Sequence, residues 1–356
     1  MHKKNYLTFF MEENNQSHFC SLSLNDLKEK ISPSFRANQV FDWVYKKKKM
    51  IFDEMKNIPL SVRASLKDNF IFPSLKLQKT FPSEDGETIK FLFKLKDGFR
   101  IEAVLIISKN RRTVCVSSQV GCRCNCQFCA SGKKGFIRNL TSGEIIEQVL
   151  HIDRDLAKKN EKTTHIVFMG MGEPFHNYGA VISAIKRFND PNCFNISQRR
   201  ITISTVGIID NIERLQNENL KINLTLSLHA SDQKKRERII PYAKKYQIDD
   251  LVLTMNSYFE KTKRDITYEY ILIDNFNDSL QDAKKLFSLL QGMQCSINLI
   301  PYNPVSECGF KRPSSEKIEA FHSFLKSKKI PTTRRYTKGK DIAAACGQLA
   351  LMENKI

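Results

Sequence analysis

The feature that most constrains this fold is an alternation of apolar, strand-like runs with helical stretches, which begins near Val114. Helices are expected from Ser142 to Lys158 and from Asp278 to Leu290. Such alternation predicts an α/β fold with a parallel sheet and right-handed crossovers, closed into a full or partial barrel. Ligands bind at the carboxyl ends of the strands in such folds. The predicted strands are Thr113–Ser117, His165–Met169, Arg200–Ser204, Lys221–Ser227, Tyr268–Ile273, Ser296–Ile300 and Pro331–Arg335.

The chain before this region has a different pattern, in which a helical stretch is followed by a hairpin. Residues 21 to about 75 look helical, and Phe91–Leu95 with Phe99–Ile107 reads as a β-hairpin turning at Asp97 and Gly98. We therefore predict a helical domain over residues 1–95, which includes the start of the hairpin. A second, larger domain is predicted over residues 96–350.

A cysteine-rich loop follows the first predicted core strand. Cys122, Cys126 and Cys129 are spaced so that a compact loop can turn three thiolates toward one [4Fe–4S] cluster. The fourth iron would then lack a protein thiolate and could bind a substrate. The alternative is a zinc site, which needs a fourth Cys or His nearby, and Cys124 is available.

The charge and the cysteine content bear on partners and compartment. Lys and Arg number 57 against 38 Asp and Glu, a formal charge of +19 that favours nucleic acid as partner; the alternative is a merely solvated basic surface. Lys46 to Lys49 could contact phosphate or be such a solvated face. No run approaches the ~20 apolar residues of a membrane span. Met1 to Phe10 is a poor signal peptide, Met11 could be the true start, and a cytoplasmic protein is expected.

Polar residues gather where the predicted strands end. Gly172 and Glu173 follow one strand, and Ser204 and Ser227 end two others, so these groups would face one cleft. The alternatives are an ordinary strand-end turn and strand capping. His229 could contact a ligand or be a buried histidine with hydrogen-bonded ring nitrogens, and the residue taken alone favours the second interpretation. Asn303 could form an Asx turn in its Pro-bracketed loop.

The motifs around these residues resemble a known family. C-x3-C-x2-C with an aromatic residue before the third cysteine is similar to the radical SAM (S-adenosylmethionine) signature, and the wider pattern is similar to the RlmN/Cfr family of RNA adenosine methyltransferases. The resemblance runs in family order from about residue 88 to 350; Cys124 and the tripeptide Ala130-Ser131-Gly132 depart from the pattern. It rests on Cys115 to Cys122, Gly135-Phe136, Arg138-Asn139-Leu140, Gly170-Met171-Gly172-Glu173-Pro174, Ser227-Leu228-His229-Ala230, Asn298 to Pro304 and Ala345-Cys346-Gly347-Gln348-Leu349.

The resemblance implies a fold, cofactors and residue roles. Residues 1–95 would be an accessory, RNA-binding domain, and residues 96–350 would be the catalytic core with a C-terminal catalytic segment. The core would be a partial (β/α) barrel of radical SAM type, with a [4Fe–4S] cluster and two SAM molecules used per turnover. Cys346 would carry a methyl group, Glu102 would be the general base, and Cys115 would resolve the intermediate through a transient disulfide. Without the resemblance, the two cysteines could be buried core thiols and Glu102 an exposed strand carboxylate. The implied SAM contacts are Gly172, Glu173, Ser204, Ser227, Leu228, His229 and Asn303.

The implied reaction is radical methylation of an adenosine carbon that is not nucleophilic. The expected substrate is carbon 2 of an adenosine in 23S rRNA, with a tRNA adenosine beside the anticodon as a second candidate. A reductant protein such as flavodoxin would supply electrons, and no membrane partner is expected. Two alternatives stay open: Cfr-like methylation at carbon 8, and a non-catalytic zinc-dependent RNA-binding module.

Overall fold

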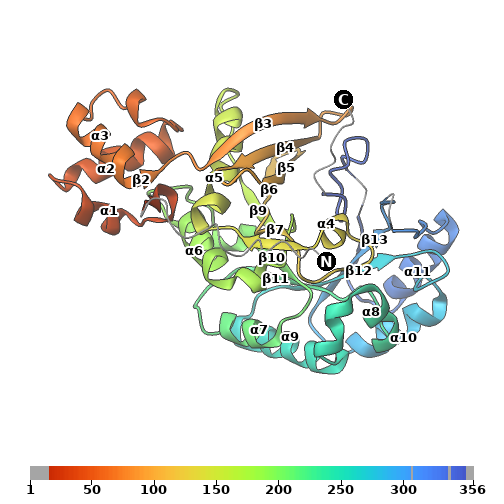
Figure 1. Cartoon of the computed structure of the whole chain (residues 1–356). Helices are drawn as coiled ribbons and strands as arrows, with labels where there is room; N and C mark the ends of the chain where they lie inside the picture. The colour runs from red at the N-terminus through yellow and green to blue at the C-terminus, as the bar shows by residue number, and fades with distance from the viewer. Residues whose placement is uncertain (1–15, 306–307, 336–337, 350–356) are drawn as a thin grey trace, which may run out of the picture.

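The computed structural model describes residues 16–305, 308–335 and 338–349. One ten-stranded sheet runs through the molecule in the order β14-β13-β12-β11-β10-β9-β6-β5-β4-β3 (Figure 1). Its end strands do not pair with each other, so the sheet curves without closing. Met1 to Phe10 and Met11 lie outside the described residues.

The β6-to-β14 part of the sheet is parallel and confirms the predicted α/β core. Each predicted core strand is present within two residues of its expected bounds at either end. Crossover helices connect the strands, which is the arrangement that parallel pairing requires. The strands are β6 (Arg111–Cys115), β9 (His165–Phe168), β10 (Ile201–Thr205), β11 (Asn223–Ser227), β12 (Ile266–Leu272), β13 (Ser296–Pro301) and β14 (Thr332–Arg334).

Helices cover the outer face of this parallel sheet (Figure 1). No helix among the described residues is long and apolar enough to cross a membrane. The longer helices begin with side-chain caps where the sequence offers them, as at Thr141 and Ser279. The helices are α5 (Ser142–Ala157), α6 (Tyr178–Asn189), α7 (Ile209–Leu215), α8 (Gln233–Ile239), α9 (Ile248–Thr262), α10 (Leu280–Leu290) and α11 (Ser315–Ser327).

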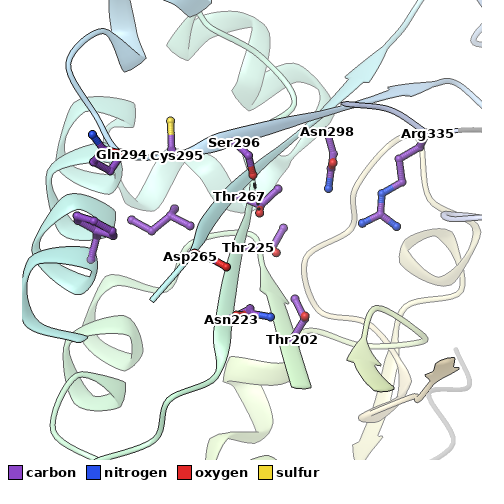
Figure 2. Close-up of a pocket in the computed structure, with 12 residues that line it drawn as sticks. Thr202, Asn223, Thr225, Asp265, Thr267, Gln294, Cys295, Ser296, Asn298 and Arg335 are labelled. Carbon is purple, nitrogen blue, oxygen red and sulfur yellow. Dashed lines mark hydrogen bonds between the residues drawn. The ribbon is translucent and has the colours of Figure 1, made fainter. Parts of the chain in front are cut away.

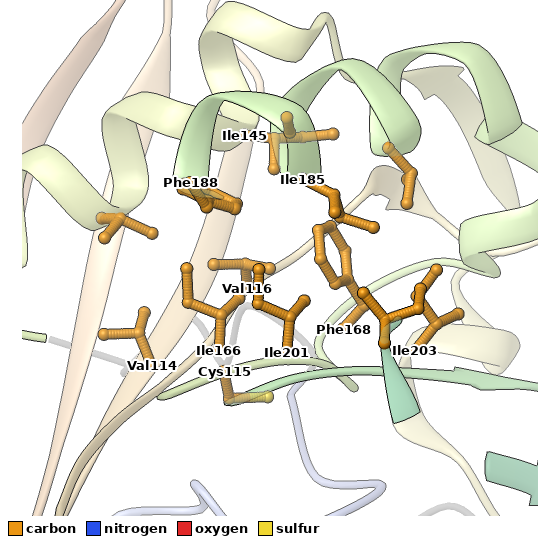
Figure 3. Close-up of a cluster of buried hydrophobic side chains, with 14 of the residues drawn as sticks. Val114, Cys115, Val116, Ile145, Ile166, Phe168, Ile185, Phe188, Ile201 and Ile203 are labelled. Atoms are coloured by element: carbon orange, nitrogen blue, oxygen red, sulfur yellow. The ribbon is translucent and has the colours of Figure 1, made fainter. Parts of the chain in front are cut away.

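The core between sheet and helices explains why β6 carries a cysteine. Val114 and Val116 pack with Ile145 and Phe188 of α5 and α6, in the fully buried cluster of Figure 3. Cys115 lies between them in the sequence, so its side chain leaves on the opposite face. Figure 3 shows its sulfur on the side of the sheet away from these helices. That opposite face is the barrel interior.

An antiparallel extension continues the sheet from β6. The predicted hairpin is confirmed as β4 (Thr88–Leu95) and β5 (Arg100–Ser108). The strand β3 (Leu75–Pro82) pairs with β4 and was missed, because its polar residues lack a clean apolar alternation. The predicted domain boundary at residues 95 and 96 falls in the turn of the hairpin.

The N-terminal region is helical, as predicted, and packs against α5 and α6. It contains α1 (Leu24–Lys30), α2 (Phe35–Phe41) and α3 (Leu60–Asn69), with short strands β1 (Ser17–His18) and β2 (Phe70–Ile71) paired beside them. Ser21 Oγ accepts a hydrogen bond from the Gly143 amide at 2.9 Å, and Arg187 donates to the Leu22 carbonyl. Figure 1 shows these helices at one end of the molecule, beyond α5 and α6.

The four-lysine run is not a uniform phosphate-binding face. Lys48 is only 15% exposed and forms an ion pair with Asp153 of α5 at 2.9 Å, so it ties the helical region to the core. Lys46 pairs with Asp42, and the Lys47 ammonium lies 3.8 Å from the centre of the Trp43 ring. Phosphate contact therefore stays a prediction only for the exposed lysines at positions 46, 47 and 49.

A buried carboxyl group holds the start of the sheet against α5. Glu147 Oε2 accepts hydrogen bonds from the Ser74 amide at 2.6 Å and the Leu75 amide at 2.9 Å, while its Oε1 has no partner. Burial raises the pKa of Glu147 to about 8, in spite of these hydrogen bonds. At neutral pH the folded protein therefore holds a proton that the unfolded chain, with its ordinary carboxyl pKa, has lost.

This proton gives a stability prediction with a definite sign. The folded state binds more protons than the unfolded state between about pH 4.5 and 8, so the Glu147 contribution to stability falls as pH rises through that window. A glutamine side chain mimics the neutral carboxyl group, so Glu147→Gln should lose less thermal stability than the wild type between pH 5.5 and 8.5. The exposed Glu213→Gln should follow the wild type in melting experiments. A Glu147→Gln curve parallel to the wild type would contradict the buried proton.

Candidate active site

A cavity of about 140 Å³ lies at the carboxyl ends of the parallel strands. The loop between β7 (Gln119–Gly121) and α4 (Ala130–Lys133) closes one side, and residues at the ends of β9 to β13 form the floor. This is the place where the sequence predicted convergence. The predicted site residues that line it are Cys122, Cys126, Cys129, Gly172, Glu173, Ser204, Ser227, His229 and Cys346.

Backbone contacts fix the cysteine loop. β7 pairs with β8 (Phe136–Asn139), and the Cys122 amide donates to the Gly135 carbonyl at 2.8 Å. Gly121 has φ +75°, and a Cβ there would lie 1.8 Å from the Gly135 carbonyl oxygen, so only glycine fits. The Gln127 amide donates to the Ile239 carbonyl at the end of α8. The loop is thus anchored at both of its flanks.

The three thiols fit an iron–sulfur cluster by type and by place. Cysteine thiolates are the usual ligands of such clusters, and all three line one cavity. Burial raises the pKa of Cys129 to about 11 and that of Cys126 well above its usual value, so these thiols stay protonated until a cation compensates them. Among the described residues, no three His, Cys, Asp or Glu groups already stand as a metal-holding cluster.

Cys124 is the fourth thiol of the loop and is buried, with 1% exposure. Its Sγ lies 3.9 Å from Nδ1 of His176, and its hydrogen bond to Cys122 lowers the Cys122 pKa. The zinc alternative needed a fourth Cys or His near the loop, and both residue types are present.

Glu173 is the buried carboxyl group of the cavity. Its Oε1 accepts from the Phe175 amide at 3.0 Å and its Oε2 from the Val206 amide at 2.9 Å. Burial raises its pKa to about 7. Gly172 precedes it with φ +103°, and the Glu173 amide donates to Gln119 Oε1 at 2.9 Å. A tight glycine turn therefore aims the carboxylate at the cavity.

Two hydroxyls and an imidazole continue the lining. Ser204 Oγ and Ser227 Oγ lie 3.2 Å apart on neighbouring strands. His229 Nδ1 accepts from the Ile271 amide at 3.1 Å, and burial lowers its pKa to about 3, so the ring is neutral. Leu228 is fully buried and does not line the cavity; its carbonyl accepts from Arg236 Nε at 3.1 Å.

The C-terminal segment brings Cys346 to the cavity. The Ala130 amide, directly after the third cysteine of the loop, donates to the Gly347 carbonyl at 2.8 Å. Asn303 Nδ2 donates to the Cys346 carbonyl at 3.4 Å, and Gln348 Nε2 donates to the Pro304 carbonyl at 3.1 Å. Cys346 is the exposed one of the ten cysteines and faces the cavity. Asn303 therefore does not line the cavity itself but holds the backbone of Cys346, which does.

Glu102 and Cys115 share the interior face of the sheet. Val104 pairs with Cys115 across β5 and β6, and Glu102 lies two residues from Val104, on the same face. The interpretation of Glu102 as an exposed strand carboxylate is wrong, because only 2% of the residue is exposed and Lys90 Nζ lies 3.2 Å from its Oε1. Burial raises the pKa of Cys115 to about 12, and the neighbouring Cys346 adds to that shift.

Sequence reasoning assigned no role to three polar residues at the floor of the cavity, namely Glu269, Asn298 and Arg335. Ser227, Glu269 and Asn298 lie in register on β11, β12 and β13. Asn298 Nδ2 and Arg335 Nη2 both donate to Glu269 Oε1, at 3.0 and 3.2 Å. The signal that could have found Glu269 was a charged residue inside an otherwise apolar strand. Asn298 and Arg335 also line a second, polar cavity of about 450 Å³ at the amino ends of the strands (Figure 2).

Comparison with known families matches both parts of the chain. Residues 23–71 match the "Ribosomal RNA large subunit methyltransferase N-terminal domain", and residues 116–287 match the "Radical SAM superfamily". A chain of Protochlamydia amoebophila named "Probable dual-specificity RNA methyltransferase RlmN 2" is 51% identical over 92% of each chain. One of Aliarcobacter butzleri, named "Dual-specificity RNA methyltransferase RlmN", is 42% identical over 92% of this chain and 94% of that one.

A solved structure agrees in fold. The crystal structure of a radical SAM methyltransferase from Sphaerobacter thermophilus matches with a TM-score of 0.92 and 41% identity. The match covers 94% of this chain and 99% of that chain. The predicted radical SAM fold, with its helical N-terminal region, is thereby confirmed.

The glycine turn before Glu173 can be tested. A Cβ on Gly172 would lie 2.6 Å from the Gln119 Cβ at a φ that L-residues rarely adopt, at a cost of about 1–3 kcal/mol. Gly172→Ala should therefore shift Glu173 and weaken SAM binding by calorimetry. Gly179→Ala is the control, since a Cβ there meets nothing within 4 Å, and it should change the free energy of unfolding by less than about 1 kcal/mol. Equal SAM affinity in both variants would contradict the positioning of Glu173 by this turn.

Proposed function

Because this chain belongs to the RlmN family of radical SAM RNA methyltransferases, we propose that it methylates carbon 2 of an adenosine in 23S rRNA. We propose a second substrate, an adenosine beside the anticodon of tRNA, since relatives carry the name "dual-specificity". The reaction would pass through an S-methylcysteine intermediate.

The observation that carries this proposal is the junction of two distant segments. The hydrogen bond between Ala130 and Gly347 places Cys346 beside the cysteine loop, and Cys346 lines the same cavity as the three loop thiols. A thiol that is exposed to this cavity is placed to carry a one-carbon unit. A non-catalytic zinc module would give this thiol no role.

Cys122, Cys126 and Cys129 would hold the [4Fe–4S] cluster of a radical SAM protein. When bound, the cluster and SAM supply a carbon-centred radical. Glu173 is suited to the SAM amino group, and Ser204, Ser227 and His229 line the rest of the site. Gly172 lets the backbone approach, while Asn303 and Leu228 would contribute through the segments that they hold. We propose two SAM molecules per turnover.

Three residues divide the remaining work. Cys346 would accept the methyl group from the first SAM by displacement. Glu102, on the same sheet face as Cys115, would take the proton from the adenine carbon. Cys115 would then attack Cys346 to release the product through a transient disulfide. Cys115 and Cys346 are not joined by a disulfide in this structure, as this cycle requires of its starting state.

Several partners follow from the charge and the family. The +19 balance favours RNA, and the N-terminal helical region with the exposed lysines at 46, 47 and 49 is a candidate for phosphate contact. A reductant protein such as flavodoxin would supply electrons. We propose that the protein acts in the cytoplasm, where its RNA substrates and a reducing environment for its thiols coincide.

Two alternatives remain distinct from this proposal. Methylation at carbon 8 would use the same thiols, but the relatives carry the name RlmN rather than Cfr. Zinc binding is favoured by Cys124 and His176, which lie 3.9 Å apart, but it leaves Cys346 without a function.

Iron content tests the cofactor. Protein purified without oxygen should be brown and contain about four irons per chain. Cys122→Ala, Cys126→Ala and Cys129→Ala should each lose the iron, because one ligand is removed. Cys124→Ala is the matched control from the same loop and should keep it. Stoichiometric zinc without iron, by metal analysis, would overturn the proposal of a radical enzyme.

A trapped RNA adduct tests the reaction and its carbon. Cys115→Ala should accept the methyl group and attack RNA, but lack the thiol that resolves the bond. A denaturing gel after incubation with SAM, reductant and RNA should show a shifted band for this variant only. Cys346→Ala and the double variant should show none.

Digestion of the trapped complex, followed by mass spectrometry, should place the link at carbon 2 of adenine. A link at carbon 8 would favour the alternative outcome. Fully active Cys115→Ala without any adduct would contradict the proposed division of roles.

A further inference from the structure

The floor of the site is a polar triad that connects two cavities. Glu269 lines the upper cavity with Cys346, while Asn298 and Arg335 line the lower one. Asn298 and Arg335 both donate to the same carboxylate oxygen, Glu269 Oε1, at 3.0 and 3.2 Å. Figure 2 shows Asn298 and Arg335 on the same side of the barrel interior. The carboxylate therefore fixes the guanidinium directly below the upper site.

Backbone pairing sets where this guanidinium can reach. The Arg335 amide donates to the Leu299 carbonyl at 2.9 Å and so continues the pairing of β14 with β13. Thr333 pairs with Asn298, and Arg335, two residues on, lies on the same interior face. Its neighbour Arg334 leaves on the other face, where its Nη1 lies 3.6 Å from Glu319 of α11. The two adjacent arginines are thus separated by the sheet.

Arg335 acts electrostatically on the thiols of Cys115 and Cys346. Cys346 is exposed to the cavity, but the protein around that cavity still keeps bulk water away from it; this desolvation is the larger effect and raises the pKa of Cys346, and the Arg335 charge opposes it. Arg335 also opposes the raised pKa of Cys115. Its side chain is 41% exposed to the lower cavity, so water and salt screen part of this charge.

We propose that Arg335, held by Glu269 and Asn298, is the positioning residue that supports the thiolate of Cys346 for methyl transfer. This rests on the proposed function, and no role for Arg335 followed from the sequence motifs. In the step it supports, the Cys346 thiolate forms a bond to the SAM methyl carbon while that carbon's bond to the sulfonium sulfur breaks. One negative and one positive charge cancel, leaving two neutral thioethers.

Other titratable groups face Cys346 and also affect its pKa. Glu269 raises its pKa and partly offsets Arg335. His229 is neutral, because burial lowers its pKa to about 3. The remaining titratable groups of the lining or nearby are Cys115, Cys122, Cys124, Cys126, Cys129 and Glu173. Arg335 is the cation that acts on Cys346 among the described residues.

Alkylation rates of single cysteines test the proposal. Iron-loaded protein is treated with iodoacetamide without oxygen, SAM or RNA, and the rate at each cysteine is read by peptide mass spectrometry. Each unit rise in thiol pKa slows alkylation about threefold, since lost thiolate outweighs gained nucleophilicity. Arg335→Gln should therefore slow the alkylation of Cys346 relative to wild type, because the charge that lowers its pKa is removed. Arg335→Lys, which keeps the charge, should restore most of that loss.

Two controls come from the chain itself. Cys295 lines the same lower cavity as Arg335, but its pKa is raised by burial alone, so its rate should not change. Arg334→Gln removes the adjacent charge on the other face and should behave as wild type.

Where Arg335→Gln holds no iron, the wild-type protein is used instead. Raising salt from about 0.05 to about 0.5 M should slow the alkylation of Cys346 but not that of Cys295.

The contrary results are equally definite. An unchanged Cys346 rate in Arg335→Gln, or parallel changes at Cys346 and Cys295, would overturn the role of Arg335. Arg335-dependent reactivity of Cys346 without methyl transfer from SAM would instead overturn the proposed function, and it would leave only the electrostatic effect of Arg335 on the thiol.

Discussion

The site depends on one constraint, the alternation of side chains across a parallel sheet. On β6 this alternation sends Val114 into the helix-covered core and Cys115 into the barrel interior. The same alternation on β11 to β13 brings Ser227, Glu269 and Asn298 to one face in register. A shift of pairing by one residue would turn every one of these groups into the apolar core. The apolar face of each strand therefore fixes the polar face as well.

Much of this could be predicted because the signals are local. Apolar runs predict where the strands end. The spacing of the cysteines in the loop after the first core strand predicts that three thiolates can bind one iron–sulfur cluster. His229 shows the limit of such reasoning: its sequence context allowed a ligand or a buried histidine. The structure gives it a backbone partner, the Ile271 amide, and a place in the cavity lining.

What could not be predicted depends on contacts between distant residues. Arg335 joins Glu269 across 66 positions, and Lys48 joins Asp153 across 105. A lysine run reads as a solvated or phosphate-binding face until its partner on another element is known. Glu102 was predicted as the general base from the family resemblance alone, with an exposed strand carboxylate as the alternative; its burial beside Lys90 of the neighbouring strand could not be read from the sequence. Burial and ion pairing are properties of the assembled fold, and they depend on partners that lie far away in the sequence.

Cys115 and Cys346 carry the same thiol group, and their different positions in the fold can explain why they would take different roles. Cys115 sits within the sheet, where desolvation raises its pKa to about 12, while Cys346 lies on a segment exposed to the cavity. A thiol must meet the SAM methyl group to receive it, so the exposed cysteine suits the carrier. The buried one needs only to reach its neighbour, and its high pKa keeps it protonated until then. Arg335 would favour ionisation of Cys346, which is exposed to the cavity. Cys115 would stay buried and protonated. Methyl transfer to Cys346 could then proceed before a disulfide forms between the two thiols.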